Sequence, residues 1–336
     1  MQLSNLYEEA PIHPYCQGCS QLKRNKATHC IQDYESLDEA DVLFLSDSFI
    51  YHNGRSNPFN SRDLETLTDI LVGSDLPGGC RVSFSAAVKC PTVREADMKT
   101  ADTHACRQHL WETIDKVKPK LVFACGNLAF KMVTKKSGIT TKRGNAFDID
   151  TGNHQFVCVP IFHPYAVHTE PKNRFIFEQD IKNALAKVIT GLKAEKIPVE
   201  LIMSEDDFDH LEWLVYTDED IAVDTETTGL NFLQDKLNTI AFSVRDKNYA
   251  VPLFHKDAPW DDHDQVLKLV KSILENPKNR KVFHNAKFDL KFLHNVGIYP
   301  TNVYDTKLMA HLWNEDVPKS LKELVKLFFP EGIDQL

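Results

Sequence analysis

The hydrophobic and polar positions follow two periods along the chain, which predicts strands interleaved with helices. In the first part of the sequence, short apolar runs predict strands at 41–45, 81–88, 121–124 and 155–160. Apolar positions three and four residues apart predict helices between them, at 62–72, 101–116 and 128–135. Strands that alternate with helices favour a largely parallel sheet within a three-layer α/β domain.

A domain boundary is predicted near residue 195. A helical pattern at 180–189 ends before Gly191, and Pro198 opens an extended segment, which predicts domains at 1–192 and 198–336. The second domain is predicted to be a mixed sheet flanked by helices. Its predicted strands are 221–224, 237–244, 249–252 and 282–283, and its predicted helices are 264–275, 286–295, 305–313 and 320–328.

Acidic residues in the second domain carry the strongest chemical signal. Asp224 and Glu226 are two residues apart on a predicted strand, so their side chains point to one face. Asn285 and Asp289 are four apart on a predicted helix, again on one face. Three converging carboxylates would repel one another without cations, which predicts two Mg²⁺ or Mn²⁺ ions for attack on a phosphodiester. The alternative is a solvated acidic turn and an ordinary amphipathic helix.

These motifs, with the segments 304–310 and 320–324, resemble the DEDD-type 3′–5′ exonucleases, most closely the proofreading domain of family A DNA polymerases. The resemblance covers about residues 198–336 and implies an RNase H-like domain that removes mismatched 3′ nucleotides from DNA. It implies that Asp224, Glu226 and Asp289 are catalytic residues that hold the two ions, with Asn285 and Lys287 near the nucleic acid.

The third motif of that family is not found between Asp289 and Leu336. We therefore expect this chain alone to be a weak or inactive nuclease. It would be a truncated piece, a split gene product or the front of a longer polymerase, with the polymerase domain absent from this chain or supplied by a second chain.

Four cysteines of the first domain form two pairs. Cys16 and Cys19 make a Cys-x-x-Cys, and Cys90 and Cys106 follow far downstream. Four thiolates can hold Zn²⁺ or a [4Fe–4S] cluster. A redox pair and ordinary buried thiols are the alternatives.

The neighbouring segments, including 40–47, 54–59, 88–91, 119–126 and 162–164, resemble the family 4 (iron–sulfur) uracil-DNA glycosylases over about residues 14–190. The resemblance implies that the four cysteines bind a structural [4Fe–4S] cluster. It also implies that Phe59 stacks on a base, that His163 is the histidine of the His-Pro motif, and that Asp47 lies near the nucleic acid.

Two departures predict a degenerate glycosylase that serves as a DNA-binding module. The family's Gly-Glu-x-Pro-Gly turn is replaced by 46–49, which lacks its glycines, and the uracil-reading Asn is replaced by Ala86. Genuine uracil excision and a purely structural α/β domain are the alternatives.

Charge and composition add little to this picture. The net charge of −9 comes entirely from residues 193–336, which hold 17 Lys and Arg against 26 Asp and Glu. A nuclease tolerates this charge because bound cations supply positive field at the phosphate. The sequence has no apolar run of about 20 residues and no signal pattern, so we expect a cytoplasmic protein without a membrane anchor.

Three overall readings remain open. The favoured one is the N-terminal part of a phage-like family A DNA polymerase. The others are a stand-alone DNA-repair protein that combines uracil excision with 3′-end trimming, and a non-catalytic DNA-binding module.

Overall fold

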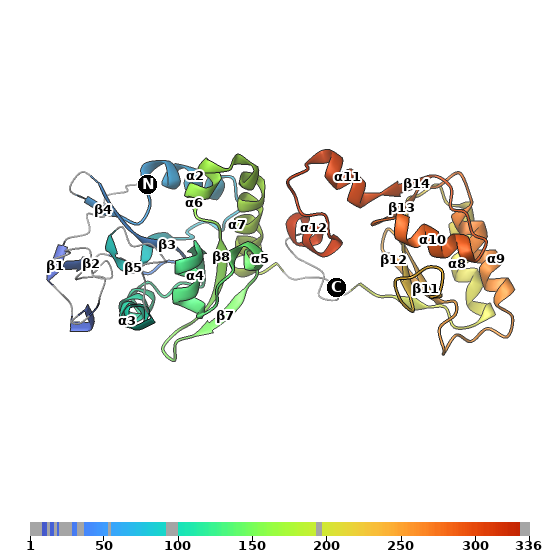
Figure 1. Ribbon diagram of the computed structural model, residues 1–336, viewed down its shortest axis with the longest axis horizontal. Helices are drawn as coiled ribbons and strands as arrows, with labels where there is room; N and C mark the ends of the chain where they lie inside the picture. Colours follow the sequence, from blue (N-terminus) through green and yellow to red (C-terminus); the bar gives the residue numbers. More distant parts are fainter. Residues whose placement is uncertain are drawn as a thin grey trace. The chain divides into compact units, whose positions relative to one another are not determined.

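The computed structural model describes residues 9–11, 14–16, 19, 29–31, 37–52, 55–91, 100–192 and 197–329. The chain divides into two compact units (Figure 1). The first unit is Met1–Ala194 with Val325–Gly332, and the second is Glu195–Leu324 with Ile333–Leu336.

The first unit is built on one mixed sheet. Strands β5, β3, β6 and β8 lie side by side and parallel, and β7 closes one edge antiparallel to β8. A short hairpin partner, β4, extends the end of β3. The strand bounds are β3 Val42–His52, β4 Arg55–Asn57, β5 Val82–Pro91, β6 Leu121–Cys125, β7 Phe147–Asp150 and β8 Gln155–Ile161, with a separate pair β1 Glu9–Pro11 and β2 His29–Ile31.

Helices cover both faces of this sheet, as Figure 1 shows. One apolar core joins the sheet to α3 and α4, and a second joins the other face to α2, α6 and α7. Alternation along β3 explains the two cores, because Leu43 and Leu45 face the first while Val42 and Phe44 face the second. The helix bounds are η1 Pro14–Cys16, α2 Ser61–Val72, α3 Thr100–Val117, α4 Asn127–Thr134, α5 Ile139–Lys142, α6 Pro164–Thr169, η4 Pro171–Asn173 and α7 Arg174–Val188.

The second unit has the strand order β12-β11-β10-β13-β14. Only β11 runs antiparallel to its neighbours in this run, while β10, β13 and β14 are parallel. This is the RNase H-like arrangement, with a short sixth strand, β9, beside β12. The strand bounds are β9 Glu200–Leu201, β10 Ile221–Thr227, β11 Leu237–Val244, β12 Lys247–Pro252, β13 Lys281–Phe283 and β14 Val303–Asp305.

The core of the second unit packs α8, α9 and α10 against the sheet. The helix bounds are η5 Glu205–Phe208, α8 Asp209–Tyr216, α9 His263–Leu274, α10 Lys287–Asn295, α11 Thr306–Trp313 and α12 Leu321–Phe328. None of the helices within the described ranges is long and apolar enough to cross a membrane.

The predicted fold class, a three-layer α/β domain followed by an RNase H-like mixed-sheet domain, is confirmed. One local expectation is wrong. The segment 46–49 is not a turn, because β3 continues through it to His52 beside β5, with an irregular register at Ser48 and Phe49. Without glycines, this segment keeps the extended conformation of the strand.

Candidate active site

Strand β10 places two of the predicted catalytic carboxylates. Its alternate residues Ile221, Val223 and Thr225 are buried, so Asp224 and Glu226 share the opposite, exposed face. Both lie toward the carboxyl end of β10, beside β11, whereas β13 pairs only with Ile221 and Ala222 at the start of the strand. The period of two therefore brings this pair together as the sequence predicts.

The third carboxylate, Asp289, is buried in the first turn of α10. Its Oδ1 accepts a hydrogen bond from Thr225 Oγ1 at 2.6 Å. Burial, together with the negative charge of nearby Asp224, raises the pKa of Asp289 to about 6. Burial also raises the pKa of Asp224, against the effect of the His284 ring. Asp224 and Asp289 are thus close enough to repel each other.

Asn285 does not lie on the helical face of Asp289, so that expectation is wrong. Its φ of 69° is left-handed and α10 begins only at Lys287. The chain turns here because Asp305 accepts the backbone N–H groups of Asn285 and Ala286, at 3.0 and 2.9 Å. A left-handed residue breaks the helical spacing, and Asn tolerates that conformation better than most residues.

His284 and Lys287 flank this turn. The His284 ring contacts Thr306 Oγ1 and the carbonyl of Lys319, both at 2.9 Å. Lys287 is exposed and lines a groove of about 570 Å³ between α10 and α11, together with Lys291, Tyr304 and other residues.

The carboxylates of Asp224, Glu226 and Asp289 do not form a single compact ion-binding site. Across the described ranges, no three His, Cys, Asp or Glu side chains stand close enough together to share an ion. Asp224 and Asp289 are electrostatically coupled, and Glu226 shares the face of Asp224. Carboxylate oxygens are nevertheless the ligands that Mg²⁺ and Mn²⁺ prefer, so the donor set fits divalent cations.

Two residues of this site were missed from the sequence. Thr225 holds Asp289, and Asp305 shapes the turn before α10 while also capping α11 through Lys307 N–H. Thr225 lies between the two acidic residues, which was the available signal. The role of Asp305 depends on a contact between residues about 20 apart.

The predicted base-binding residues of the first unit lie at the carboxyl edge of its sheet. Phe59 is buried beside the half-buried His163, with ring centroids 5.5 Å apart. His163 Nδ1 accepts the N–H of Tyr165 at 3.2 Å, and burial with the nearby His168 lowers the pKa of His163 to about 4. This ring is neutral at physiological pH, with its proton on Nε2.

Asp47 has a structural contact that the sequence did not reveal. Its Oδ1 accepts the N–H of Ala129 at 2.8 Å, in the first turn of α4. The carboxylate approaches so closely that a Cβ at position 126 would collide with it, which explains Gly126. Asp47 therefore satisfies and neutralises the start of a helix.

Phe49 belongs to the segment that replaces the glycine-containing turn of the resembled family. Phe49 and Ala86 are completely buried and pack together as a small apolar cluster. The buried Lys89 ammonium lies 5.8 Å from the Phe49 ring centroid and donates to Ser85 Oγ at 2.8 Å. The space beside Ala86 is thus filled by an aromatic ring.

The four predicted cluster cysteines are all buried, with exposed fractions between 2% and 7%. The N–H of Cys19 donates to the carbonyl of Cys16, and Cys90 and Cys106 belong to one core. Four buried sulfurs of one domain are a donor set that fits a thiolate-bound metal centre. Among the described residues, no three of these sulfurs stand close enough together to share an ion.

Comparison with known families and proteins agrees with both halves of this picture. Residues 199–335 match the 3′-5′ exonuclease family, and residues 38–188 match the uracil DNA glycosylase superfamily.

Three curated relatives match different shares of this chain. A DNA polymerase of Bacillus phage SP01 is 23% identical over 68% of this chain and 28% of its own length. DNA polymerase I of Pseudomonas aeruginosa is 36% identical over 37% of this chain and 14% of its own length. A type-4 uracil-DNA glycosylase of Sulfurisphaera tokodaii is 28% identical over 46% of this chain and 74% of its own length.

The chain spans less than a third of the length of the two polymerases it matches. The order of its two parts nevertheless follows from the matched segments, and each part has the fold that its family match requires. The chain joins a domain of the uracil DNA glycosylase superfamily to a 3′–5′ exonuclease domain.

Proposed function

We propose that this chain is the N-terminal part of a DNA polymerase, in which the second domain removes mismatched nucleotides from the 3′ end of DNA. The observation that carries the proposal is the meeting of Asp224 and Asp289 at one edge of an RNase H-like sheet, with Glu226 beside Asp224. The similarity to two DNA polymerases, one from a phage, supports the polymerase context.

The three carboxylates are proposed to hold two Mg²⁺ or Mn²⁺ ions, which would supply an activated water and stabilise the leaving oxygen. Thr225 would orient Asp289 through its 2.6 Å hydrogen bond, leaving the second carboxylate oxygen to the cation. Burial raises the pKa values of both Asp224 and Asp289, the negative charge of Asp224 adds to the rise at Asp289, and a cation would relieve that repulsion.

The DNA strand is proposed to pass along the groove between α10 and α11. Lys287 and Lys291 offer charge for phosphates on one wall, while Tyr304, Leu308 and Met309 offer apolar surface for bases. The groove is lined in part by Ala286, the residue that precedes α10, three residues before Asp289.

A binding experiment tests the ion site without relying on turnover. Mn²⁺ titrated into the chain should bind at the carboxylate edge, and Asp224→Asn should weaken that binding. Asp246→Asn is the matched control, because Asp246 is an exposed acid on the turn between β11 and β12. If both variants bind Mn²⁺ equally well, Asp224 is not a ligand of the ion.

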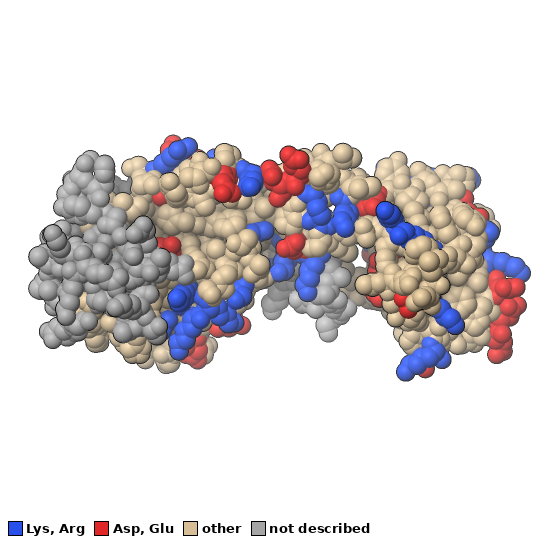
Figure 2. Space-filling view, viewed as in Figure 1, with Lys and Arg blue, Asp and Glu red and all other residues tan. Residues whose placement is uncertain are grey.

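We propose that the first domain binds DNA without excising uracil efficiently. Phe49 packs against Ala86, which leaves neither the reading amide nor space for a base at that position. A DNA-binding surface is offered by residues 131–143, which contain five Lys and Arg and no acid. Figure 2 shows Lys and Arg gathered over the α4 and β7 region.

Charge reversal tests this surface. Lys135 is exposed, and Lys135→Glu should weaken binding of duplex DNA and flatten its salt dependence, because phosphate contacts release counterions. The control is Lys118→Glu, whose ammonium is already paired with Glu39 at 2.9 Å. If the two variants bind DNA equally well, this segment does not contact DNA.

We also propose that Cys16, Cys19, Cys90 and Cys106 bind a structural [4Fe–4S] cluster, supported by their burial and by similarity to a type-4 uracil-DNA glycosylase. Protein purified without oxygen should be brown, with absorbance near ~400 nm and about four irons per chain. If the protein is colourless and carries stoichiometric zinc, the four cysteines form a zinc site and not an iron–sulfur cluster. If the protein carries no metal, the proposed metal site is wrong.

A further inference from the structure

A histidine lies against one of the four cluster cysteines. The short helix η1 brings Cys16 to α3, where Cys16 Sγ lies 3.2 Å from His109 Nε2. Tyr15, the residue before Cys16, meets the same imidazole edge to face, with ring centroids 5.5 Å apart. Two neighbouring residues of η1 therefore contact one ring of α3.

Helix α3 presents His109 beside another proposed ligand. Cys106 and His109 are three residues apart, so they share one helical face, and both are buried. His109 is 1% exposed, whereas His104, near the start of the same helix, is exposed. The two histidines of α3 thus lie in opposite environments.

The chemistry of the contact fixes its direction when metal is bound. A ligating sulfur is a thiolate and has no proton to give, so His109 Nε2–H must donate to it. Glu112 Oε2 lies 3.8 Å from His109 Nδ1, on the far side of the ring. At 3.8 Å this carboxylate is too distant to accept a hydrogen bond from Nδ1, so the direction of the contact is set by the thiolate at Nε2.

We propose that His109 is a positioning residue for the metal centre, donating a hydrogen bond to the Cys16 thiolate. This inference rests on the proposed four-cysteine centre. The ligand class is a thiolate-bound metal, either a [4Fe–4S] cluster or Zn²⁺. Such outer hydrogen bonds orient a ligand and withdraw charge from its sulfur.

The experiment compares His109→Leu, His109→Gln and His104→Leu in the whole chain, each loaded with metal. Transfer of the metal to a chelator should be about 10- to 100-fold faster in His109→Leu than in the wild type, the usual cost of losing an outer-shell partner. His109→Gln should recover part of this loss because its amide can still donate. His104→Leu should match the wild type.

A spectroscopic measurement separates a hydrogen bond from simple packing. If the centre is iron–sulfur, its reduction potential should become more negative in His109→Leu, and the reduced wild-type cluster should show hyperfine coupling to ¹⁵N-labelled histidine. If it is zinc, Co²⁺ substitution should show a shifted sulfur-to-metal charge-transfer band in His109→Leu.

The outcomes distinguish the two levels of the proposal. Wild-type protein that binds no metal overturns the four-cysteine centre and the role of His109 together. A bound metal with unchanged transfer rate and spectrum in His109→Leu overturns the role of His109 alone. Should His109→Leu fail to fold, absence of ¹⁵N-histidine coupling, or for zinc an unshifted band in His109→Phe, which keeps a ring but cannot donate, would overturn it.

Discussion

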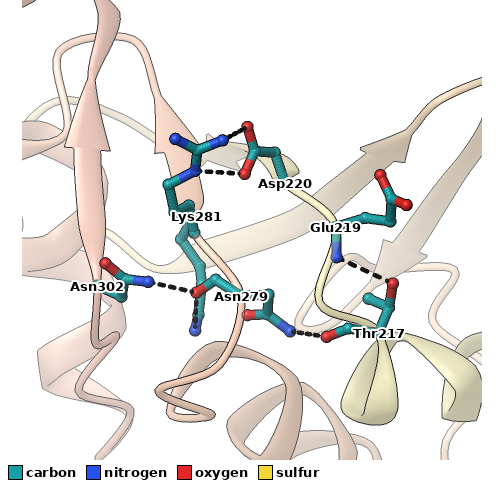
Figure 3. Close-up of polar contacts among 7 residues, drawn as sticks. Thr217, Glu219, Asp220, Asn279, Lys281 and Asn302 are labelled. Carbon is teal, nitrogen blue, oxygen red and sulfur yellow. Dashed lines mark hydrogen bonds and ion pairs between the residues drawn. The ribbon is translucent and has the colours of Figure 1, made fainter.

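Replacing Lys281 by Met should change how the stability of the second domain depends on pH. Lys281 opens β13 and its side chain is completely buried. Its ammonium donates to the backbone carbonyls of Asn276 and Asn279, the second at 3.1 Å. Figure 3 shows that the Asn279 carbonyl also accepts a hydrogen bond from the Asn302 amide. Burial lowers the pKa of Lys281 from its ordinary 10.5 to about 8.

The sign of the effect follows from proton binding. Between pH 8 and 10.5 the unfolded chain binds more protons at this lysine than the folded chain, so the free energy of unfolding rises with pH in that window. Below pH 8 the cost of burying the charge is complete and constant. Integrated from pH 7 to pH 10, Lys281 should add about 2.5 kcal/mol of stability to the wild type.

Lys281→Met removes both the free-energy cost of burying the charged ammonium and the hydrogen bonds that the ammonium donates. Losing the donor leaves the Asn276 carbonyl without this partner, which lowers the free energy of unfolding by about 1–3 kcal/mol. Removing the buried charge raises the free energy of unfolding by about 3 kcal/mol at neutral pH. The variant should therefore be within about 2 kcal/mol of the wild type at pH 7 and clearly less stable at pH 10.

Urea unfolding followed by tryptophan fluorescence at pH 7, 8, 9 and 10 measures this difference. Subtracting the variant from the wild type cancels the tyrosines and thiols that titrate in the same range. Lys278→Met is the matched control, because Lys278 is an exposed lysine of the loop that precedes β13. Parallel pH curves for wild type and Lys281→Met would refute the reasoning.

Three further predictions concern activity. In a longer protein that digests 3′ ends with Mg²⁺, Asp224→Ala should abolish release of labelled nucleotides and Asp246→Ala should not; retained digestion by the first variant would contradict its role. Thr225→Val should lower the same rate about 10-fold by freeing Asp289, equivalent to the loss of about 1.4 kcal/mol of transition-state stabilisation; an unchanged rate would mean that the hydroxyl only packs. Ala86→Asn should not create uracil release from labelled oligonucleotides and should destabilise the first domain by about 1–3 kcal/mol through overpacking against Phe49; efficient release would overturn the filled-pocket argument.

The sequence by itself determined the features that depend on local period and chain order. Strand alternation placed Asp224 and Glu226 on one face, and the alternation of strands and helices predicted the α/β class of both domains. These inferences succeed because side-chain direction within a strand is set by the backbone alone. The two resemblances likewise depended on the order of short motifs along the chain.

Only the tertiary structure decided which polar groups are used by neighbours far away in sequence. Asp305 holds the turn at Asn285, which removes that residue from the helix predicted to carry it. Asp47 binds the start of α4, and Phe49 fills the space beside Ala86. Such contacts depend on packing between segments, and no periodicity of the sequence encodes which carboxylate meets which N–H group.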